Sequence, residues 1–353
     1  MKKQKKAREL LPPSNEEVQF ETTFRGKYRG LCLFLICCAL LIAAFAISSV
    51  WMQGEGNGWL GNANETDTRE DPDEKYATGE IADGEQTNKN QDEIEEIPAH
   101  AMPIVEKDLS CLELGDRYIH NETAYAPDVQ SLQEKVLSVA NGQPPTVLIL
   151  HTHTSEGYLP PDTSYVTEPL GELTYTRNEQ ENVIAVGRAL AEALKKKGIT
   201  AIHCTVMHDA SGLSGAYERS AETVKKYMEQ YPEICLVIDL HRDAVISSDG
   251  EAVSAVTEIG GERVAQVMAV VGSDGNGTVH DRWQDNLSLA LQLRSELNKQ
   301  GNLCRPVSLR NASFYQELAP FALLLGIGTS AGTVGQAIAA AELVGDAIAR
   351  MLY

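Results

Sequence analysis

The segment that decides the fold reads Thr146-Val-Leu-Ile-Leu-His-Thr-His-Thr-Ser-Glu156, and its counterpart reads Ile234-Cys-Leu-Val-Ile-Asp-Leu-His-Arg-Asp243. Each begins with a short, mostly apolar run rich in residues that favour buried strands. Histidines and carboxylates follow directly on that run. Ligands and metal ions bind preferentially at the edge of a sheet where parallel strands end. The two segments therefore predict a sheet edge at which imidazoles and carboxylates gather.

Strand-like and helix-like runs alternate from Thr146 to the C-terminus. One helix has its apolar residues on a single stripe and ends on Lys195-Lys-Lys197 followed by Gly198, which is a typical helix stop. Alternation of this kind predicts an α/β fold of three layers, with a mostly parallel twisted sheet and helices on both of its faces. Strands are predicted at 146–150, 199–206, 234–240, 264–271 and 322–327, and helices at 181–197, 214–230, 283–299 and 334–351.

The N-terminal third has a different organisation. Residues 1–29 form a basic tail, and residues 30–52 are an uncharged apolar run long enough to span a bilayer as a helix. The positive-inside rule places the tail in the cytoplasm, so we expect a single-pass protein of the cytoplasmic membrane with its C-terminal part outside. A cleaved signal peptide is the alternative, but the basic region is very long for one.

An acidic linker is predicted after this anchor. Residues 53–100 contain few large apolar side chains and therefore cannot offset the entropy of ordering the chain. Residues 101–143 are interpreted as an edge segment of the extracytoplasmic region, with helical spacing over 128–140, and residues 144–353 as the main domain. The formal net charge of −20 argues against nucleic acid as a partner.

Histidines at two strand ends point to a hydrolytic zinc site. Such sites usually have three ligands drawn from His, Asp and Glu, together with an open position for water. We expect His151 or His153 to supply one ligand and His241 another. Side chains alternate along a strand, so one of the first two can bind metal while the other orients it. Glu156, or a carboxylate of the 178–181 segment, would complete the set.

Further residues are candidates for contact with substrate. Arg242 is placed to hold a substrate carboxylate or carbonyl, and Asp243 to orient a ligand. Glu179 and Glu181 lie in the segment that precedes the first helix. Trp283 begins a later helix, where it either lines a sugar or peptide groove or packs in the core.

These strings together resemble the stage II sporulation protein P family. The apolar anchor, acidic spacer and C-terminal domain also match its layout, and the resemblance covers roughly the last 210 residues best. The strings that carry it are Val147-Leu-Ile-Leu-His-Thr-His-Thr-Ser-Glu156, Asn182-Val-Ile-Ala-Val-Gly187, Val237-Ile-Asp-Leu-His-Arg-Asp-Ala244, Val271-Gly272 and Trp283-Gln-Asp-Asn-Leu287.

The resemblance implies a cell-wall hydrolase of endospore formers with the fold of the zinc N-acetylmuramoyl-L-alanine amidases. It further implies stem-peptide endopeptidase activity and a role in septal-wall thinning and engulfment during sporulation. The implied partners are peptidoglycan, a lytic transglycosylase and a membrane anchor protein. Carried over to this chain, the family pattern gives Zn²⁺ as cofactor and His151, His153, Glu156 and His241 as its ligands.

One segment departs from the family pattern. The last strand of the family normally ends in Leu-Leu-Val-Glu-Val-Gly, whose Glu corresponds to the acid/base of the related amidases. Here the string is Leu323-Leu-Leu-Gly-Ile-Gly328, so Gly326 stands where that carboxylate is expected. A positioned acid or base typically contributes 10²–10⁴-fold to a rate, so its loss should weaken turnover and leave binding intact. Glu317, just before the strand, is the candidate to substitute for it.

Two functions follow, with a third less favoured. The first is a membrane-anchored zinc amidase acting on peptidoglycan. The second is a catalytically weakened or inactive relative that binds peptidoglycan or engulfment partners, and Gly326 is the reason to consider it. The third is a metallo-phosphoesterase, which the lack of a dense Asp/Asn/His cluster for two metals disfavours.

Overall fold

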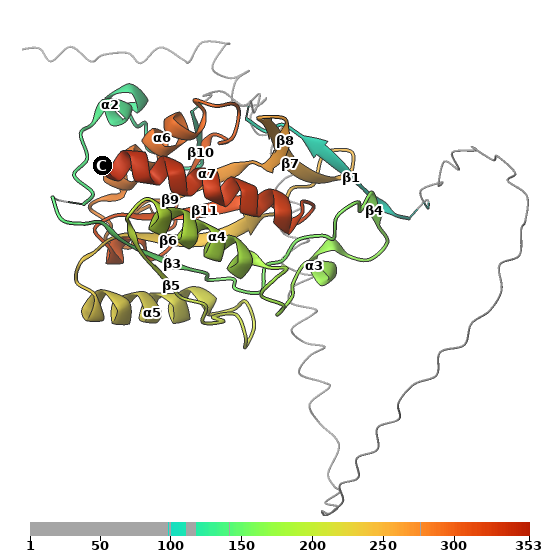
Figure 1. The fold of residues 1–353 in the computed structure, drawn as a ribbon, viewed down its shortest axis with the longest axis horizontal. Helices are drawn as coiled ribbons and strands as arrows, with labels where there is room; N and C mark the ends of the chain where they lie inside the picture. Colours follow the sequence, from blue (N-terminus) through green and yellow to red (C-terminus); the bar gives the residue numbers. More distant parts are fainter. Residues whose placement is uncertain (1–97, 99, 111–117, 141, 276) are drawn as a thin grey trace, which may run out of the picture. The chain divides into compact units, whose positions relative to one another are not determined.

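The computed structural model describes residues 98, 100–110, 118–140, 142–275 and 277–353 (Figure 1). The predicted basic tail, membrane anchor and nearly all of the acidic linker lie outside these residues. Within the described part of the chain, no helix is both long and apolar enough to cross a membrane.

A seven-stranded sheet forms the centre of the described region, in the order β2-β10-β9-β11-β6-β3-β5. Five of its six strand pairings are parallel, and only β9 and β11 run in opposite directions. The predicted, mostly parallel sheet is therefore confirmed. The strands are β2 (Ile119–Asn121), β3 (Thr146–Leu150), β5 (Thr200–His203), β6 (Ile234–Asp243), β9 (Val267–Gly272), β10 (Val307–Arg310) and β11 (Ala322–Thr329).

The reversal at β9 was not predicted, and it has a local cause. The predicted strand 264–271 is divided between β8 (Glu262–Ala265) and β9. β7 (Ala252–Ile259) and β8 form an antiparallel hairpin that turns at Gly260-Gly261, where both glycines have positive φ. The chain thus leaves β6 and returns to the sheet without a crossover helix, and a parallel pairing requires such a crossover.

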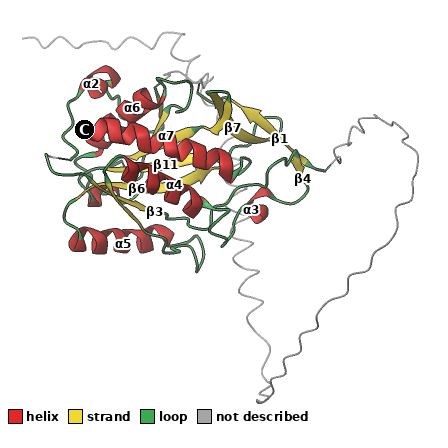
Figure 2. Ribbon diagram, viewed as in Figure 1, coloured by secondary structure: helices red, strands yellow, loops and turns green. Residues whose placement is uncertain are grey.

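Helices cover both faces of this sheet (Figure 2). On one face, α4 (Val183–Lys196), α6 (Trp283–Leu297) and α7 (Val334–Leu352) share a core with Val147, Ile149 and other sheet residues. On the other face, α5 (Ala216–Gln230) packs against Leu148 and Leu150. Neighbouring residues of β3 thus alternate between the two cores, as the period of a strand requires. The three-layer prediction is confirmed.

Helix ends follow the chemistry of the sequence. The Asn182 side chain caps α4 by accepting from the backbone N–H of Ile184, and Lys195 and Lys196 occupy the last turn. Thr333 and Gln336 form a capping box at the start of α7. These caps fix where each helix leaves the sheet edge that carries the polar strings.

The segment before β3 contributes one strand to each of two sheets. β1 (Met102–Lys107) joins a second, four-stranded sheet in the order β4-β1-β7-β8, with β4 at Tyr165–Val166, and β2 pairs with β10 in the main sheet. The helix expected over 128–140 is shorter: α2 spans Val129–Glu134 and packs on α6. Val136 is 94% exposed, so a longer helix would have no apolar face to bury. Two short elements remain, α3 (Leu170–Leu173) and the 3₁₀ turn η1 (Gln316–Leu318).

Candidate metal centre

The two polar strings lie side by side because β3 and β6 are neighbouring parallel strands. Leu150, the last residue of β3, pairs with Asp239 of β6. The His-Thr-His-Thr-Ser-Glu string then turns over the end of β3, while β6 continues through His241 to Asp243. The sequence prediction that these segments share one sheet edge is therefore confirmed.

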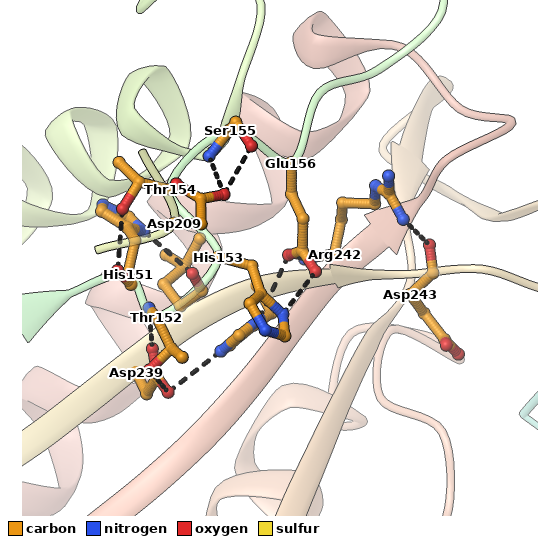
Figure 3. Close-up of polar contacts among 12 residues, drawn as sticks. His151, Thr152, His153, Thr154, Ser155, Glu156, Asp209, Asp239, Arg242 and Asp243 are labelled. Atoms are coloured by element: carbon orange, nitrogen blue, oxygen red, sulfur yellow. Dashed lines mark hydrogen bonds and ion pairs between the residues drawn. The ribbon is translucent and has the colours of Figure 1, made fainter. Parts of the chain in front are cut away.

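His153, Glu156 and His241 converge at this edge. One ligand atom from each lies within 4.8 Å of the others. The two oxygens of Glu156 face the two imidazoles: Oε1 is 3.3 Å from His153 Nδ1, and Oε2 is 3.1 Å from His241 Nδ1. Figure 3 shows the side chains of His153 and Glu156 approaching each other from the loop after β3. Two imidazoles and a carboxylate are the ligand set of many hydrolytic zinc sites.

Glu156 and His241 are buried, His153 is half-buried, and the cluster is strongly polarised. Burial on its own would raise the pKa of Glu156, but His241, His153 and Arg242 outweigh it and hold that pKa far below its usual range. Burial would likewise lower the pKa of His241, yet Asp239 and Glu156 beside it raise the pKa well above its usual value. Without a metal the site therefore holds a carboxylate and a protonated imidazole. A divalent cation would replace that proton.

Asp239 stands behind His241, at the position of an outer ligand. One of its oxygens lies 2.9 Å from His241 Nε2. The backbone N–H and the hydroxyl of Thr152 donate to the Asp239 carboxylate at 2.9 and 2.8 Å and fix its orientation. A carboxylate that orients a ligating histidine is a common feature of zinc sites.

The residues present fit a zinc ion. His241 turns Nε2 toward Asp239 and Nδ1 toward Glu156, so Nδ1 is the nitrogen that faces the cluster. Two imidazoles and a carboxylate give the nitrogen and oxygen donors that zinc binds in hydrolytic sites. His153, Glu156 and His241 would hold the ion, and Asp239 would support His241.

His151 does not join this cluster, although the sequence places it among the candidate ligands. Its Nδ1 donates to the Leu240 carbonyl at 2.8 Å, and its Nε2 lies 2.9 Å from His203 Nε2. Burial lowers the pKa of His151 to about 4 and that of His203 to about 3, so both rings are neutral near pH 7. In Figure 3 His151 lies apart from His153 and Glu156. His151 thus bonds to the Leu240 carbonyl and His203, and it neither joins the cluster nor contacts His153 in the way expected of a residue that orients the metal ligand.

Gly187 of α4 makes room for this neutral pair. A Cβ at this position would lie 2.6 Å from His203 Nε2 and 2.8 Å from two atoms of the His151 ring. The helix therefore approaches the two imidazoles more closely than any residue with a side chain would allow.

Arg242 and Asp243 are engaged in the protein itself. The guanidinium of Arg242 donates to the carbonyls of Gly157 and Thr174, both at 3.1 Å, and lies over the Tyr175 ring. The Arg242 backbone N–H donates to Glu156 Oε2 at 3.0 Å, so this residue fixes the Glu156 carboxylate. Asp243 forms an ion pair with Arg305 at 2.8 Å. Neither side chain is free to contact substrate in the way that the sequence suggests.

The other predicted site residues lie outside the cluster. Glu179 and Glu181 are exposed on the segment before α4, where Glu179 pairs with Arg188. Trp283 is buried in the core and packs against the Tyr125 ring at 4.9 Å. Glu317 lies in η1, and its Oε2 is buried without a hydrogen-bond partner among the described residues. Of the two roles considered for Trp283, the structure shows packing in the core.

Gly326 of β11 pairs directly with His241 of β6. A Cβ added here would meet its nearest atoms, in Asp243 and Met268, at 3.8 Å, which is ordinary van der Waals contact. Paired residues of neighbouring strands project to the same face. A side chain at this position would therefore fit and would lie on the same face as His241.

Sequence reasoning missed two contributors to the site. Asp239 lies two residues before His241 on a strand, and this spacing alone places both side chains on one face. Tyr217 of α5 has its ring centroid 5.5 Å from that of His153 and 6.4 Å from that of His241. No pattern around Tyr217 indicates this contact, because it depends on how α5 docks.

A comparison with known families identifies the chain. The profile of the Stage II sporulation protein P (SpoIIP) family matches residues 49–349. The chain belongs to this family. Among curated proteins, Stage II sporulation protein P of Bacillus subtilis (strain 168) is 25% identical over 224 residues, which are 60% of this chain and 52% of the relative. This SpoIIP-family chain thus matches only about half the length of that relative.

Solved amidase structures also show some likeness to the SpoIIP-family chain. N-acetylmuramoyl-L-alanine amidase AmiC2 of Nostoc punctiforme is 14% identical with a TM-score of 0.34, covering 59% of this chain and 94% of that one. The N-acetylmuramoyl-L-alanine amidase of Clostridium difficile 630 is 14% identical with a TM-score of 0.35 and the same coverage. Similarity at this level does not carry an activity over to this chain.

Proposed function

We propose that this SpoIIP-family chain is a zinc-dependent peptidoglycan hydrolase of the N-acetylmuramoyl-L-alanine amidase type. The observation that supports it most directly is the convergence of His153, Glu156 and His241 at one sheet edge. A zinc ion bound there would supply a nucleophilic water near neutral pH and polarise the scissile carbonyl.

The protein's own residues would prepare the site for that chemistry. Glu156 stays ionised because His241 and His153 flank it and because the Arg242 backbone N–H donates to it. Asp239 holds the ring of His241, and Thr152 holds Asp239. Ligands that are fixed in this way require little reorganisation when the ion binds.

The cellular role we propose follows from family membership and the N-terminal sequence. The chain would be a single-pass protein of the cytoplasmic membrane with its C-terminal domain outside, and it would thin septal wall during engulfment. The same proposal includes stem-peptide endopeptidase activity. It also includes a lytic transglycosylase and a membrane anchor protein as partners.

A second candidate is a weakened or inactive amidase-like protein that binds wall or engulfment partners. Gly326 favours it, because the position opposite His241 carries no carboxylate to serve as acid or base. The space around Gly326 admits a side chain, so Gly326→Glu is a clean test of this alternative.

The two candidates are separated by wall digestion with the full-length protein in detergent, with and without chelator. Release of muropeptide ends that depends on zinc supports the hydrolase, and His241→Ala should abolish it. Binding to wall without release, converted to release by Gly326→Glu, supports the weakened form. Release that chelator leaves unchanged would contradict the zinc hydrolase.

A further inference from the structure

The first turn of α5 is fixed against the loop that carries the metal ligands. The His208 ring donates to the His151 carbonyl at 2.7 Å, and Arg219 of α5 hydrogen-bonds the carbonyl of His208. Both the backbone N–H and the hydroxyl of Ser155 bond to Asp209. These contacts link the loop 204–215 to the His-Thr-His-Thr-Ser-Glu string and hold Tyr217, the second residue of α5, at the site.

Four aromatic rings set the position of the Tyr217 ring. It lies nearly parallel to the His241 ring, at an interplanar angle of 17°, and edge-on to His153 at 79°. The rings of Phe314 and Tyr315 pack on it at 5.7 and 6.0 Å.

The backbone that presents two of these neighbours is strained. Phe314 and Tyr315 have φ of 51° and 47°, values that residues with side chains rarely adopt. The Tyr315 hydroxyl lies 2.9 Å from the hydroxyl of Thr152, which in turn holds Asp239. Strain of this kind persists only where the surroundings fix it, and it is concentrated at functional sites. The aromatic contacts are thus built into the site.

The hydroxyl of Tyr217 differs from the other polar groups near the ligands. Thr152 and Tyr315 are bonded to each other, Arg242 is bonded to backbone carbonyls, and Asp239 and Glu156 are acceptors. The Tyr217 hydroxyl forms no hydrogen bond with the described residues, although its side chain is partly buried. It is therefore a neutral donor that is free for a ligand.

We propose that the Tyr217 hydroxyl is a catalytic hydrogen-bond donor that stabilises the negative charge developing on the scissile carbonyl oxygen; this rests on the hydrolase function proposed above. As the oxygen of the attacking water bonds to the carbonyl carbon, the C=O π pair moves onto the carbonyl oxygen. Tyr217 donates to that oxygen and keeps its own proton. When the C–N bond breaks, the C=O bond re-forms, and a proton originating from the water ends on the leaving amine.

A tyrosine hydroxyl suits a donor that is not itself an acid or base. Its ordinary pKa is about 10, so it stays protonated throughout the neutral range. This role would matter most in a chain that lacks the carboxylate at position 326.

The test compares the full-length, zinc-loaded wild-type protein with Tyr217→Phe and with Tyr227→Phe, a matched removal of a hydroxyl further along α5. The first readout is the affinity for acetohydroxamate, a small zinc-binding probe whose oxygen occupies the position of the carbonyl oxygen. The second readout is wall hydrolysis. Zinc affinity and the midpoint of thermal unfolding control for structural effects.

We expect Tyr217→Phe to bind zinc like wild type, to bind acetohydroxamate about 10-fold or more weakly, and to hydrolyse wall about 10²-fold more slowly. Tyr227→Phe should match wild type. Unchanged hydroxamate affinity and hydrolysis in Tyr217→Phe would overturn the role of Tyr217 and leave the hydrolase intact. Weaker hydroxamate binding in a protein that never releases muropeptides would retain the donor and reject the hydrolase. A protein that does not bind zinc would reject both.

Discussion

Two pairs of histidines lie close together at the same sheet edge, and they differ in what surrounds their rings. His153 and His241 flank Glu156, and Asp239 and Glu156 hold His241 in its charged form. His151 and His203 face each other next to Gly187 of α4, where burial keeps both neutral. His151 and His153 are only two residues apart, so what separates a candidate metal ligand from a structural residue is the carboxylate beside it.

The largest effect expected from this comparison is loss of metal. We expect His153→Ala to lower zinc affinity by more than about 100-fold, because one of three ligands disappears from the cluster. Competition with a chromophoric chelator measures this. His280→Ala, which removes a buried histidine outside both pairs, should leave the affinity unchanged. Equal affinity in His153→Ala and wild type would show that the ion binds elsewhere.

The neutral pair should contribute to folding and contribute little to metal binding. His151→Ala removes a fully buried ring and leaves the Leu240 carbonyl and His203 without their partners. A loss of about 3 kcal/mol in the free energy of unfolding is expected. Urea denaturation measures it. If the folded variant also lost its zinc affinity, the separation between the two pairs would be wrong.

The pH dependence of stability sharpens the same comparison. In the unfolded chain His151 and His203 take up protons near pH 6.5, but in the folded protein only near pH 4 and 3. Because the unfolded state binds more protons in this interval, the free energy of unfolding should fall as the pH drops from 6.5 to 4, by roughly 2–3 kcal/mol for each of the two histidines.

Other groups of the site act mainly outside this interval. The raised pKa of His241 gives stability that is present below pH 6.5 and lost as the pH rises through its folded value. The lowered pKa of Glu156 gives stability that is lost mainly below its ordinary value of 4.5. Unfolding of the metal-free protein at several pH values, repeated with His203→Gln, measures the effect. A slope that His203→Gln leaves unchanged would contradict the assignment.

The smallest expected effect concerns Gly187, which backs the neutral pair. Gly187→Ala should destabilise the protein by about 2 kcal/mol, because the new methyl group would press on both imidazoles. Gly335→Ala in α7 is the matched control: its Cβ would meet nothing closer than 4.0 Å, so a gain of about 0.5 kcal/mol is expected. Thermal unfolding compares the two, and similar shifts would show that the pair tolerates displacement.

Much of the fold could be read from the sequence. The apolar runs of β3, β6 and β11 and the striped helices α4 and α7 are long and regular, and their order sets the layers. The direction of β9 could not be read, because it depends on the β7–β8 hairpin, which replaces a crossover helix with a turn. The extent of α2 depends on what it packs against, and local spacing does not reveal that.

The site was predictable to a similar degree. Strand ends that carry His and Glu indicated where the cluster lies, and Asp239 was within reach of the same reasoning. The choice between His151 and His153 was not, because it depends on how the chain turns after Leu150 and on His203 from another strand. The hydrogen bonds from Arg242 to Gly157 and Thr174 could not be predicted from the sequence around Arg242 either. Those carbonyls come from a loop about seventy residues or more away in sequence.

The hydrogen bonds from Arg242 to the carbonyls of Gly157 and Thr174 have an evolutionary consequence. One guanidinium ties together both ends of the excursion from Gly157 to Thr174, so the exposed residues between them can change without shifting Glu156. Natural variation among relatives should therefore accumulate at those exposed positions.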